Sequence, residues 1–152
     1  MVKVMATGTF DLLHMGHIYF LKEAKKLGDT LCVVVATDNT VRNLKHEPVN
    51  PEQIRLDLIS ELTIVDEAYL GYENDIYTIV EEIKPDIIAI GYDQIHNEEK
   101  INDELKKRKL SAKVVRLSEY KCGSDLDGTR RIIQKIISAY EFQKKMEQIE
   151  RK

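Results

Sequence analysis

A chain of 152 residues, 43% hydrophobic and 32% charged, is long enough to bury a core of its own without a metal or a disulfide. The formal net charge of −3 disfavours a general nucleic-acid binder, because that class carries a basic balance, and no apolar run approaches the roughly 20 residues that span a membrane. Two cysteines, Cys32 and Cys122, are too few for a structural zinc site or a disulfide framework, so we expect a cytoplasmic protein without nucleic-acid or membrane partners.

Five short apolar runs predict β-strands. In chain order they are VKVMA (2–6), TLCVVVA (30–36), EAYLGY (67–72), DIIAIG (86–91) and AKVVRL (112–117). Helical patterns separate these runs, and the alternation predicts a mostly parallel sheet covered by helices on both faces. The sequence contains no internal repeat or linker, so residues 1–152 are expected to form a single domain.

The segments between the strands predict helices through their apolar spacing and their end signals. One such signal is Asn50 followed by Pro51, which is typical of an N-cap and the first helical residue. The last helix is amphipathic in its first half and mostly charged in its second half. The predicted helices cover 18–27, 50–62, 75–83, 98–109, and about 128 to the C-terminus.

Unusual residues follow four of the five predicted strands. The segment 8–17 follows the first strand, Asp38 the second, 91–93 the fourth and 121–131 the fifth. Ligands of parallel sheets bind beyond the carboxyl ends of the strands, where the strand order reverses. We therefore expect these four groups to meet at one edge of the sheet and to form a ligand site there.

The stretch GTFDLLHMGH joins the first strand to the first helix. Gly8 and Gly16 have no side chain, so a phosphate or a nucleobase could approach the backbone closely. His14 and His17 can project to one side, next to a helix N-terminus that favours anions. Beside a triphosphate we expect these imidazoles to become protonated.

Other interpretations of the two histidines are weaker. A lone histidine near a helix start is usually a cap or a surface residue, and metal ligation lacks a third ligand at a sensible spacing. However, a generic turn does not require a strand, GTFD, H-x-G-H and a helix in this order, and the combination favours a catalytic role.

This stretch resembles the signature of the cytidylyltransferase-like nucleotidyltransferases, with H-M-G-H as their H-x-G-H motif. The resemblance extends over nearly the whole chain. It implies a Rossmann-like, doubly wound, five-stranded parallel sheet, and attack by a substrate phosphate on the nucleotide α-phosphorus with release of pyrophosphate. It also implies that His14 and His17 are catalytic, and that Thr9, Phe10 and Gly16 bind the nucleotide.

A second phosphate-binding segment is predicted in CGSDLDGTRR, before the last helix. Thr129 can donate from its hydroxyl and backbone, and Arg130 or Arg131 can neutralise a β- or γ-phosphate. On the residues alone, Asp127 as a simple N-cap with solvated arginines is an equal alternative. The segment resembles the family's I-S-T-T or S-S-T-R, with Gly128 in place of the usual serine, and the resemblance favours Arg130 as a catalytic residue.

Further candidate residues are Gly91 and Asp93, Asp38 and Arg55, which match family positions, and Lys45, which could reach the transferred phosphate from its loop. Asp93 lies in a G-x-D segment, where Gly91 leaves room for the base or ribose and Asp93 could accept from a ribose hydroxyl. Asp38, Lys45 and Arg55 are expected to bind the acceptor. The alternatives are a turn-forming aspartate, a solvent-facing lysine and a surface ion pair.

The loop before the last helix bears on the substrates. Glycerol-3-phosphate cytidylyltransferases carry R-T-x-G-I-S-T-T there, whereas this chain has Tyr120-Lys121-Cys122-Gly123. The overall pattern resembles the archaeal stand-alone FAD synthases, which implies transfer of AMP from ATP to FMN. The alternatives are a cytidylyltransferase acting on glycerol 3-phosphate or a related phosphorylated alcohol or sugar, and a non-catalytic nucleotide sensor.

The resemblance also bears on the cofactor and the assembly. We expect a divalent metal ion, Mg²⁺ before Co²⁺ or Mn²⁺, held mainly through phosphate oxygens and water and not by a protein metal site. A homodimer is expected from the resemblance and from the apolar face of the last helix.

Overall fold

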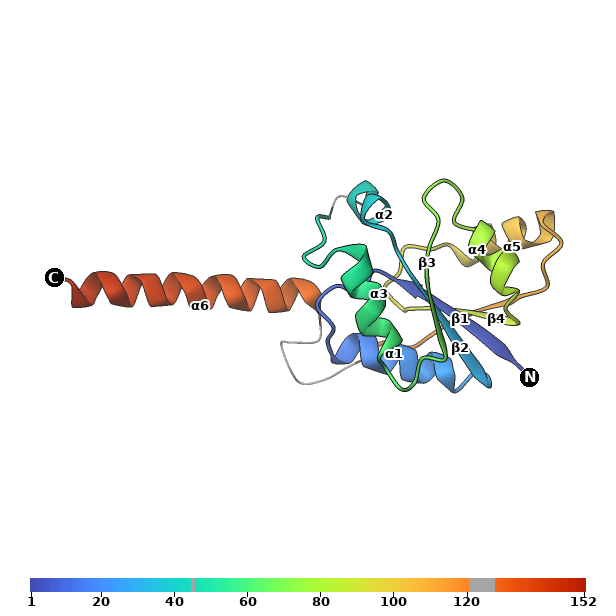
Figure 1. The fold of residues 1–152 in the computed structure, drawn as a ribbon, viewed down its shortest axis with the longest axis horizontal. Helices are drawn as coiled ribbons and strands as arrows, with labels where there is room; N and C mark the ends of the chain where they lie inside the picture. Colours follow the sequence, from blue (N-terminus) through green and yellow to red (C-terminus); the bar gives the residue numbers. More distant parts are fainter. Residues whose placement is uncertain (45, 121–127) are drawn as a thin grey trace.

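The computed structural model describes residues 1–44, 46–120 and 128–152. Its strands form one parallel sheet in the order β3-β2-β1-β4-β5 (Figure 1). The predicted five-stranded parallel sheet is therefore confirmed. Four strands lie within their predicted runs, and β1 overlaps its run and extends to Gly8. The bounds are β1 Lys3–Gly8, β2 Thr30–Val35, β3 Glu67–Leu70, β4 Ile87–Ile90 and β5 Lys113–Arg116.

The described helices are α1 Met15–Lys25, α2 Asp38–Asn43, α3 Glu52–Ser60, α4 Thr78–Ile83, α5 Glu98–Lys107 and α6 Thr129–Glu150. The sequence did not predict α2, where we expected only a turn at Asp38. The Asn50 cap is also wrong, because α3 begins after Pro51 without a side-chain cap. The backbone of Asn50 is used elsewhere: its amide donates to Asp11 and its carbonyl accepts from Arg55.

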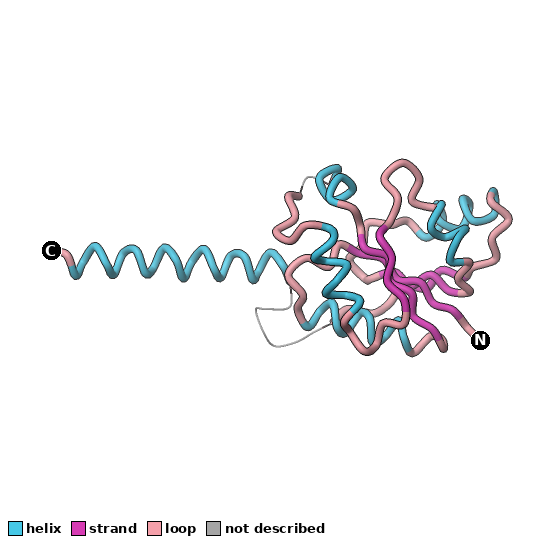
Figure 2. The backbone as a smooth tube through the Cα atoms, viewed as in Figure 1, coloured by secondary structure: helices cyan, strands magenta, loops and turns pink. Residues whose placement is uncertain are grey.

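Both faces of the sheet are covered, as predicted for a doubly wound fold (Figure 2). Successive residues of a strand point to opposite faces, so Val4 and Ala6 enter one core cluster and Met5 enters the other. The first cluster includes Leu21 of α1 and Ile59 of α3. The second is closed by apolar residues of α4 and α5, namely Ile79, Val80, Ile83, Ile101 and Leu105.

The strand order places β1 between β2 and β4, so the chain reverses its direction of travel across the sheet at β1. In such sheets the crevice outside the carboxyl ends of the strands at this point is where ligands bind. The segments that leave β1 and β4 there are the histidine turn (residues 8–17) and the loop 91–96. The fold therefore brings two of the predicted site segments together.

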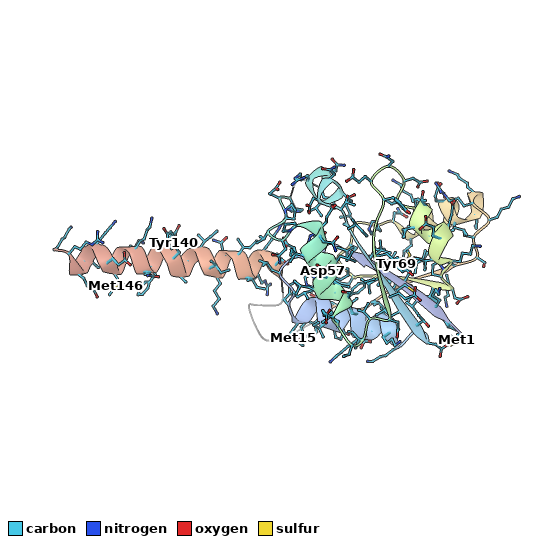
Figure 3. The ribbon with its side chains drawn as sticks, in the orientation of Figure 1. Met1, Met15, Asp57, Tyr69, Tyr140 and Met146 are labelled. Carbon is cyan, nitrogen blue, oxygen red and sulfur yellow. The ribbon has the colours of Figure 1, made fainter. Side chains whose placement is uncertain are left out.

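Helix α6 projects away from the rest of the domain (Figure 1). It contains no buried residue, and its apolar side chains from Ile136 onward, including Tyr140 and Met146, are exposed (Figure 3). The predicted apolar face thus exists, and its burial in a homodimer stays a prediction. Among the described residues, no helix combines the length and apolar character needed to cross a membrane.

Candidate active site

The turn after β1 has an unusual backbone. Phe10 and Leu12 adopt positive φ angles of 54° and 48°, a region that costs non-glycine residues roughly 1–2 kcal/mol each. The Phe10 ring lies against Gly8, where an added Cβ would come within 2.9 Å of the ring atom Cζ. Phe10 is therefore buried beneath the turn, and its ring also meets the His17 ring edge-on at 5.5 Å between centroids.

The two histidines form a capping box at the start of α1. The Gly16 amide donates to Nδ1 of His14 at 3.0 Å, and the His14 amide donates to Nδ1 of His17 at 3.3 Å. Because both Nδ1 atoms accept, each neutral ring carries its proton on Nε2. An imidazolium has no free acceptor, so protonation of either ring would break one of these bonds.

Burial, and to a lesser extent the neighbouring His14, lower the pKa of His17 to about 3. The imidazoles stack with their centroids 3.7 Å apart. In the absence of a nucleotide, His17 is therefore neutral at physiological pH and can donate through Nε2. The expected protonation beside a triphosphate would have to overcome both the burial and the cap.

A cavity of about 640 Å³ opens beside this pair, and we call it the histidine cavity. Every residue predicted to be catalytic or to bind the nucleotide lies in its wall. They are Thr9, Phe10, His14, Gly16, His17, Gly91, Asp93, Thr129 and Arg130. The wall thus draws on β1, α1, the loop after β4 and the start of α6, which the sequence separates by more than a hundred positions.

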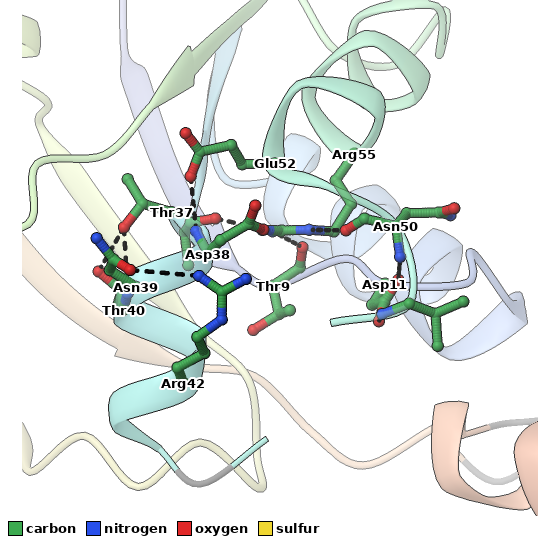
Figure 4. Close-up of polar contacts among 12 residues, drawn as sticks. Thr9, Asp11, Thr37, Asp38, Asn39, Thr40, Arg42, Asn50, Glu52 and Arg55 are labelled. Carbon is green, nitrogen blue, oxygen red and sulfur yellow. Dashed lines mark hydrogen bonds and ion pairs between the residues drawn. The ribbon is translucent and has the colours of Figure 1, made fainter. Parts of the chain in front are cut away.

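Two of the predicted acceptor-binding residues are placed differently. Arg55 is completely buried, and its guanidinium donates to Asp38 Oδ1, to Thr9 O and to Ala36 O, each at 2.8 Å (Figure 4). Neither Arg55 nor Asp38 lines the histidine cavity or the second cavity, which is described below. The two side chains tie the ends of β1 and β2 to α3, and their role in binding the acceptor stays a prediction. The third acceptor residue, Lys45, lies outside the described residues, as do Cys122, Asp125 and Asp127.

The start of α6 is fastened to the histidine turn. The Thr129 hydroxyl donates to Asp11 O at 2.7 Å, and Arg130 lies 3.3 Å from Nε2 of His46. The Asp11 carboxylate accepts from the amides of Val49 and Asn50 at 2.6 and 2.9 Å. The sequence did not suggest a role for Asp11. Its position in GTFD is the signal that could have identified it as a structural residue.

The loop 91–96 is organised by Arg116, at the end of β5. Its guanidinium donates to the carbonyls of Gly91 at 2.9 Å and His96 at 2.6 Å, and its Nε donates to Glu98. Gln94 fastens the loop to β1, because its side-chain amide Nε2 donates to Thr7 O at 2.8 Å. The sequence analysis missed both residues, since backbone carbonyl acceptors leave no sequence pattern.

An aromatic pair lines the histidine cavity. Tyr19 and Tyr120 stack with their centroids 4.9 Å apart, and the Tyr19 hydroxyl lies 3.1 Å from Ser118 Oγ. Faces of this kind are suited to stacking with a nucleobase. The wall of the cavity therefore contains both aromatic rings and groups that can bind phosphate, namely the paired histidines and Arg130.

The described part of the chain contains no group of three or more His, Cys, Asp or Glu residues that could hold a metal ion. Asp11 is committed to two backbone amides, and the other described carboxylates in the wall of the histidine cavity are Glu47, Asp93 and Glu119. This donor set fits Mg²⁺ held by phosphate oxygens and water better than a metal held by the protein alone.

Comparison with known proteins gives the family. A model of the cytidylyltransferase-like family matches residues 5–147. The chain belongs to this family. The histidine turn, the loop after β4 and most of α6 all fall inside the matched range.

Individual members are similar over most of their length. The chain is 55% identical to the FAD synthase of Aciduliprofundum boonei over 137 residues, which covers 90% of this chain and 91% of that protein. It is also 55% identical to the FAD synthase of Methanothermus fervidus, covering 87% and 92%. The crystal structure of a Thermoplasma volcanium protein described as a lipopolysaccharide core biosynthesis protein has 53% identity and a TM-score of 0.78, covering 80% of this chain and 99% of that one.

Proposed function

We propose that this protein is an FMN adenylyltransferase that transfers AMP from ATP to FMN, giving FAD and pyrophosphate. One observation carries the proposal. Nine predicted catalytic and nucleotide-binding residues line a single cavity, in a chain that is 55% identical over 90% of its length to an FAD synthase.

The reaction needs position and charge stabilisation more than covalent chemistry. A phosphate oxygen of FMN attacks the α-phosphorus of ATP, and the bond from that phosphorus to the oxygen bridging to the β-phosphate breaks. The attacking phosphate is already ionised, so no base is needed. The Nε2–H groups of His14 and His17 are suited to stabilise charge on the α-phosphoryl oxygens.

The remaining wall of the histidine cavity suggests how ATP lies. Arg130 and Thr129 stand where the leaving pyrophosphate would be, and α6 is fixed there by the Thr129–Asp11 bond. Asp93 can accept from the ribose hydroxyls, and the Tyr19–Tyr120 pair offers a stacking surface for adenine. A divalent ion bound to the triphosphate would neutralise part of its charge, and Asp93 is one carboxylate of the cavity wall that could contact it.

Pyrophosphate release tests the proposal. We expect pyrophosphate release with ATP and FMN together. We expect no release with ATP alone or with CTP and glycerol 3-phosphate. Mass spectrometry identifies the FAD product. Turnover with CTP and glycerol 3-phosphate but not with ATP and FMN would overturn it in favour of the cytidylyltransferase. No release with any of these acceptors would favour the nucleotide sensor. Removing bound metal with a chelator, adding back Mg²⁺, Mn²⁺ or Co²⁺ in turn and measuring pyrophosphate release identifies the metal that supports turnover.

A further inference from the structure

A second cavity of about 560 Å³ lies across the sheet edge from the histidine cavity, and we call it the apolar cavity. Its floor is the α4/α5 face of the sheet, with Met5, Val34 and Ile88. The two cavities share a wall at the carboxyl ends of β1 and β4. The shared residues are Thr7, Gly8, Thr9, His46, Asp93 and Gln94. The two cavities are therefore adjacent at the end of β1.

The apolar cavity is chemically unlike its neighbour. No lysine or arginine lines it among the residues that the structure describes, so it has no cation for a phosphate. Its volume is within the range of small-molecule sites. Large apolar side chains among its lining residues are exposed to solvent, and such patches mark binding surfaces. These residues, which we call the mouth of the cavity, are Leu44, Tyr72, Ile76 and Ile95.

We propose that the apolar cavity binds the isoalloxazine ring of the flavin, with the ribityl chain crossing over Gly8 and Thr9 to bring the phosphate to the histidine cavity. This rests on the function proposed above. A flat tricyclic ring gains affinity by covering apolar surface, whereas a glycerol phosphate would leave the cavity to water. The cavity thus favours FMN over small phosphorylated alcohols.

The aromatic wall of this cavity is held in place before any ligand binds. The Arg108 guanidinium lies 5.3 Å from the centroid of the Tyr77 ring. The same guanidinium pairs with Asp75, Glu81 and Glu104 at 2.8–3.0 Å. At the mouth, the Tyr72 hydroxyl donates to Glu82 at 2.8 Å. A wall that is already ordered loses little conformational entropy when a rigid ring binds. Arg108 is therefore a positioning residue.

Polar groups at the rim suit the hydrogen-bonding edge of a flavin. The hydroxyls of Thr37 and Thr40 lie 2.9 Å apart at one side of the cavity, and His96 lies in its wall. Burial, and then the charge of Arg116, lower the pKa of His96, so its neutral ring offers one donor and one acceptor. A pyrimidine-dione edge presents both kinds of group.

The test compares two matched variants. Ile76→Glu places a charge at the mouth of the apolar cavity, and Ile54→Glu places the same charge on α3, away from both cavities; the two isoleucines are 50% and 46% exposed. We expect Ile76→Glu to raise KM for FMN about tenfold or more while KM for ATP changes less than about twofold. Ile54→Glu should leave both constants unchanged. Thermal melting checks that each variant is folded.

FMN itself is the direct probe, through the change in its absorbance and fluorescence on titration with protein. We expect Ile76→Glu to weaken this binding and Ile54→Glu not to. If the wild-type protein makes FAD but Ile76→Glu leaves FMN binding and KM for FMN unchanged, the cavity assignment fails while the function stands. If the wild type makes no FAD, the proposed function fails. In that case the FMN titration alone tests the cavity assignment. The assignment fails if Ile76→Glu binds FMN as the wild type does, or if the wild type does not bind FMN.

Discussion

The backbone amide of His14 donates to Nδ1 of His17, and the two imidazoles stack with their centroids 3.7 Å apart. The same atoms cap α1, and both histidines line the histidine cavity. The two interpretations of the motif, as helix caps and as catalytic residues, are therefore compatible: the cap fixes the ring tautomers from which the chemistry would follow.

His17→Ala tests the catalytic role. Loss of one well-placed donor to the phosphoryl oxygens should lower kcat at least about tenfold, with only a modest change in ATP binding. Steady-state kinetics and ATP titration separate the two effects. Because the variant also loses a capping bond, its free energy of unfolding must be measured in parallel. Unchanged turnover in a folded variant would remove His17 from the mechanism.

The lowered pKa of His17 makes stability depend on pH. The pKa is about 6.5 when the chain is unfolded and about 3 when folded, so below pH 6.5 the unfolded state binds more protons. The contribution is fully present above pH 6.5 and is lost as the pH falls toward 3, by up to about 1.4 kcal/mol per pH unit. Urea unfolding between pH 6.5 and 4.5 should show a shallower dependence for His17→Asn. Parallel dependences for the two proteins would contradict this.

Gly8→Ala tests the support beneath the histidines. The added methyl group would lie 2.9 Å from Cζ of Phe10, whose ring contacts His17. Phe10 must then move and the imidazole with it, so we expect kcat to fall about tenfold or more, since small misplacements of reacting groups are costly. Gly91→Ala is the comparison. Its methyl would meet only ordinary protein contacts of 3.5 Å or more, so the loss should come from contact with the nucleotide and appear in KM for ATP more than in kcat.

Arg55→Met distinguishes a structural tie from an acceptor contact. The change leaves the Asp38 carboxylate and three carbonyls without their donor, so we expect about 3–5 kcal/mol less stability in chemical denaturation. KM for FMN should stay within about threefold of the wild-type value at a temperature where the variant is folded. A variant of normal stability with a greatly raised KM for FMN would support the acceptor role.

Arg116→Lys tests the organisation of the loop after β4. A lysine keeps the charge but cannot fork between the Gly91 and His96 carbonyls. The loop that carries Asp93 would lose its fixed shape. We therefore expect KM for ATP to rise about threefold to tenfold with little change in kcat. Equal effects on KM and kcat, or none on either, would show that Arg116 does not act through nucleotide binding.

Much of the nucleotide half of the site could be predicted from the sequence. The histidine turn is contiguous, and its neighbours Gly91, Thr129 and Arg130 follow predicted elements that end at one edge of the sheet. The acceptor half could not be predicted in this way. Arg55 looked like an acceptor ligand or a surface residue, but its hydrogen bonds to Thr9 and Ala36 span 46 and 19 positions and bury it completely.

By itself the sequence determined the alternating strands and helices, the parallel sheet and the glycine- and histidine-containing turn, because periodicity and turn chemistry act between residues close along the chain. Only the tertiary structure decided which charged residues remain free to meet a ligand. The guanidinium groups of Arg55 and Arg116 donate to backbone carbonyls, and the apolar cavity is lined by residues of three strands and three helices, β1, β2, β4, α2, α4 and α5, together with loops between them. Such contacts depend on how elements pack in space, and packing leaves no local trace in the order of residues.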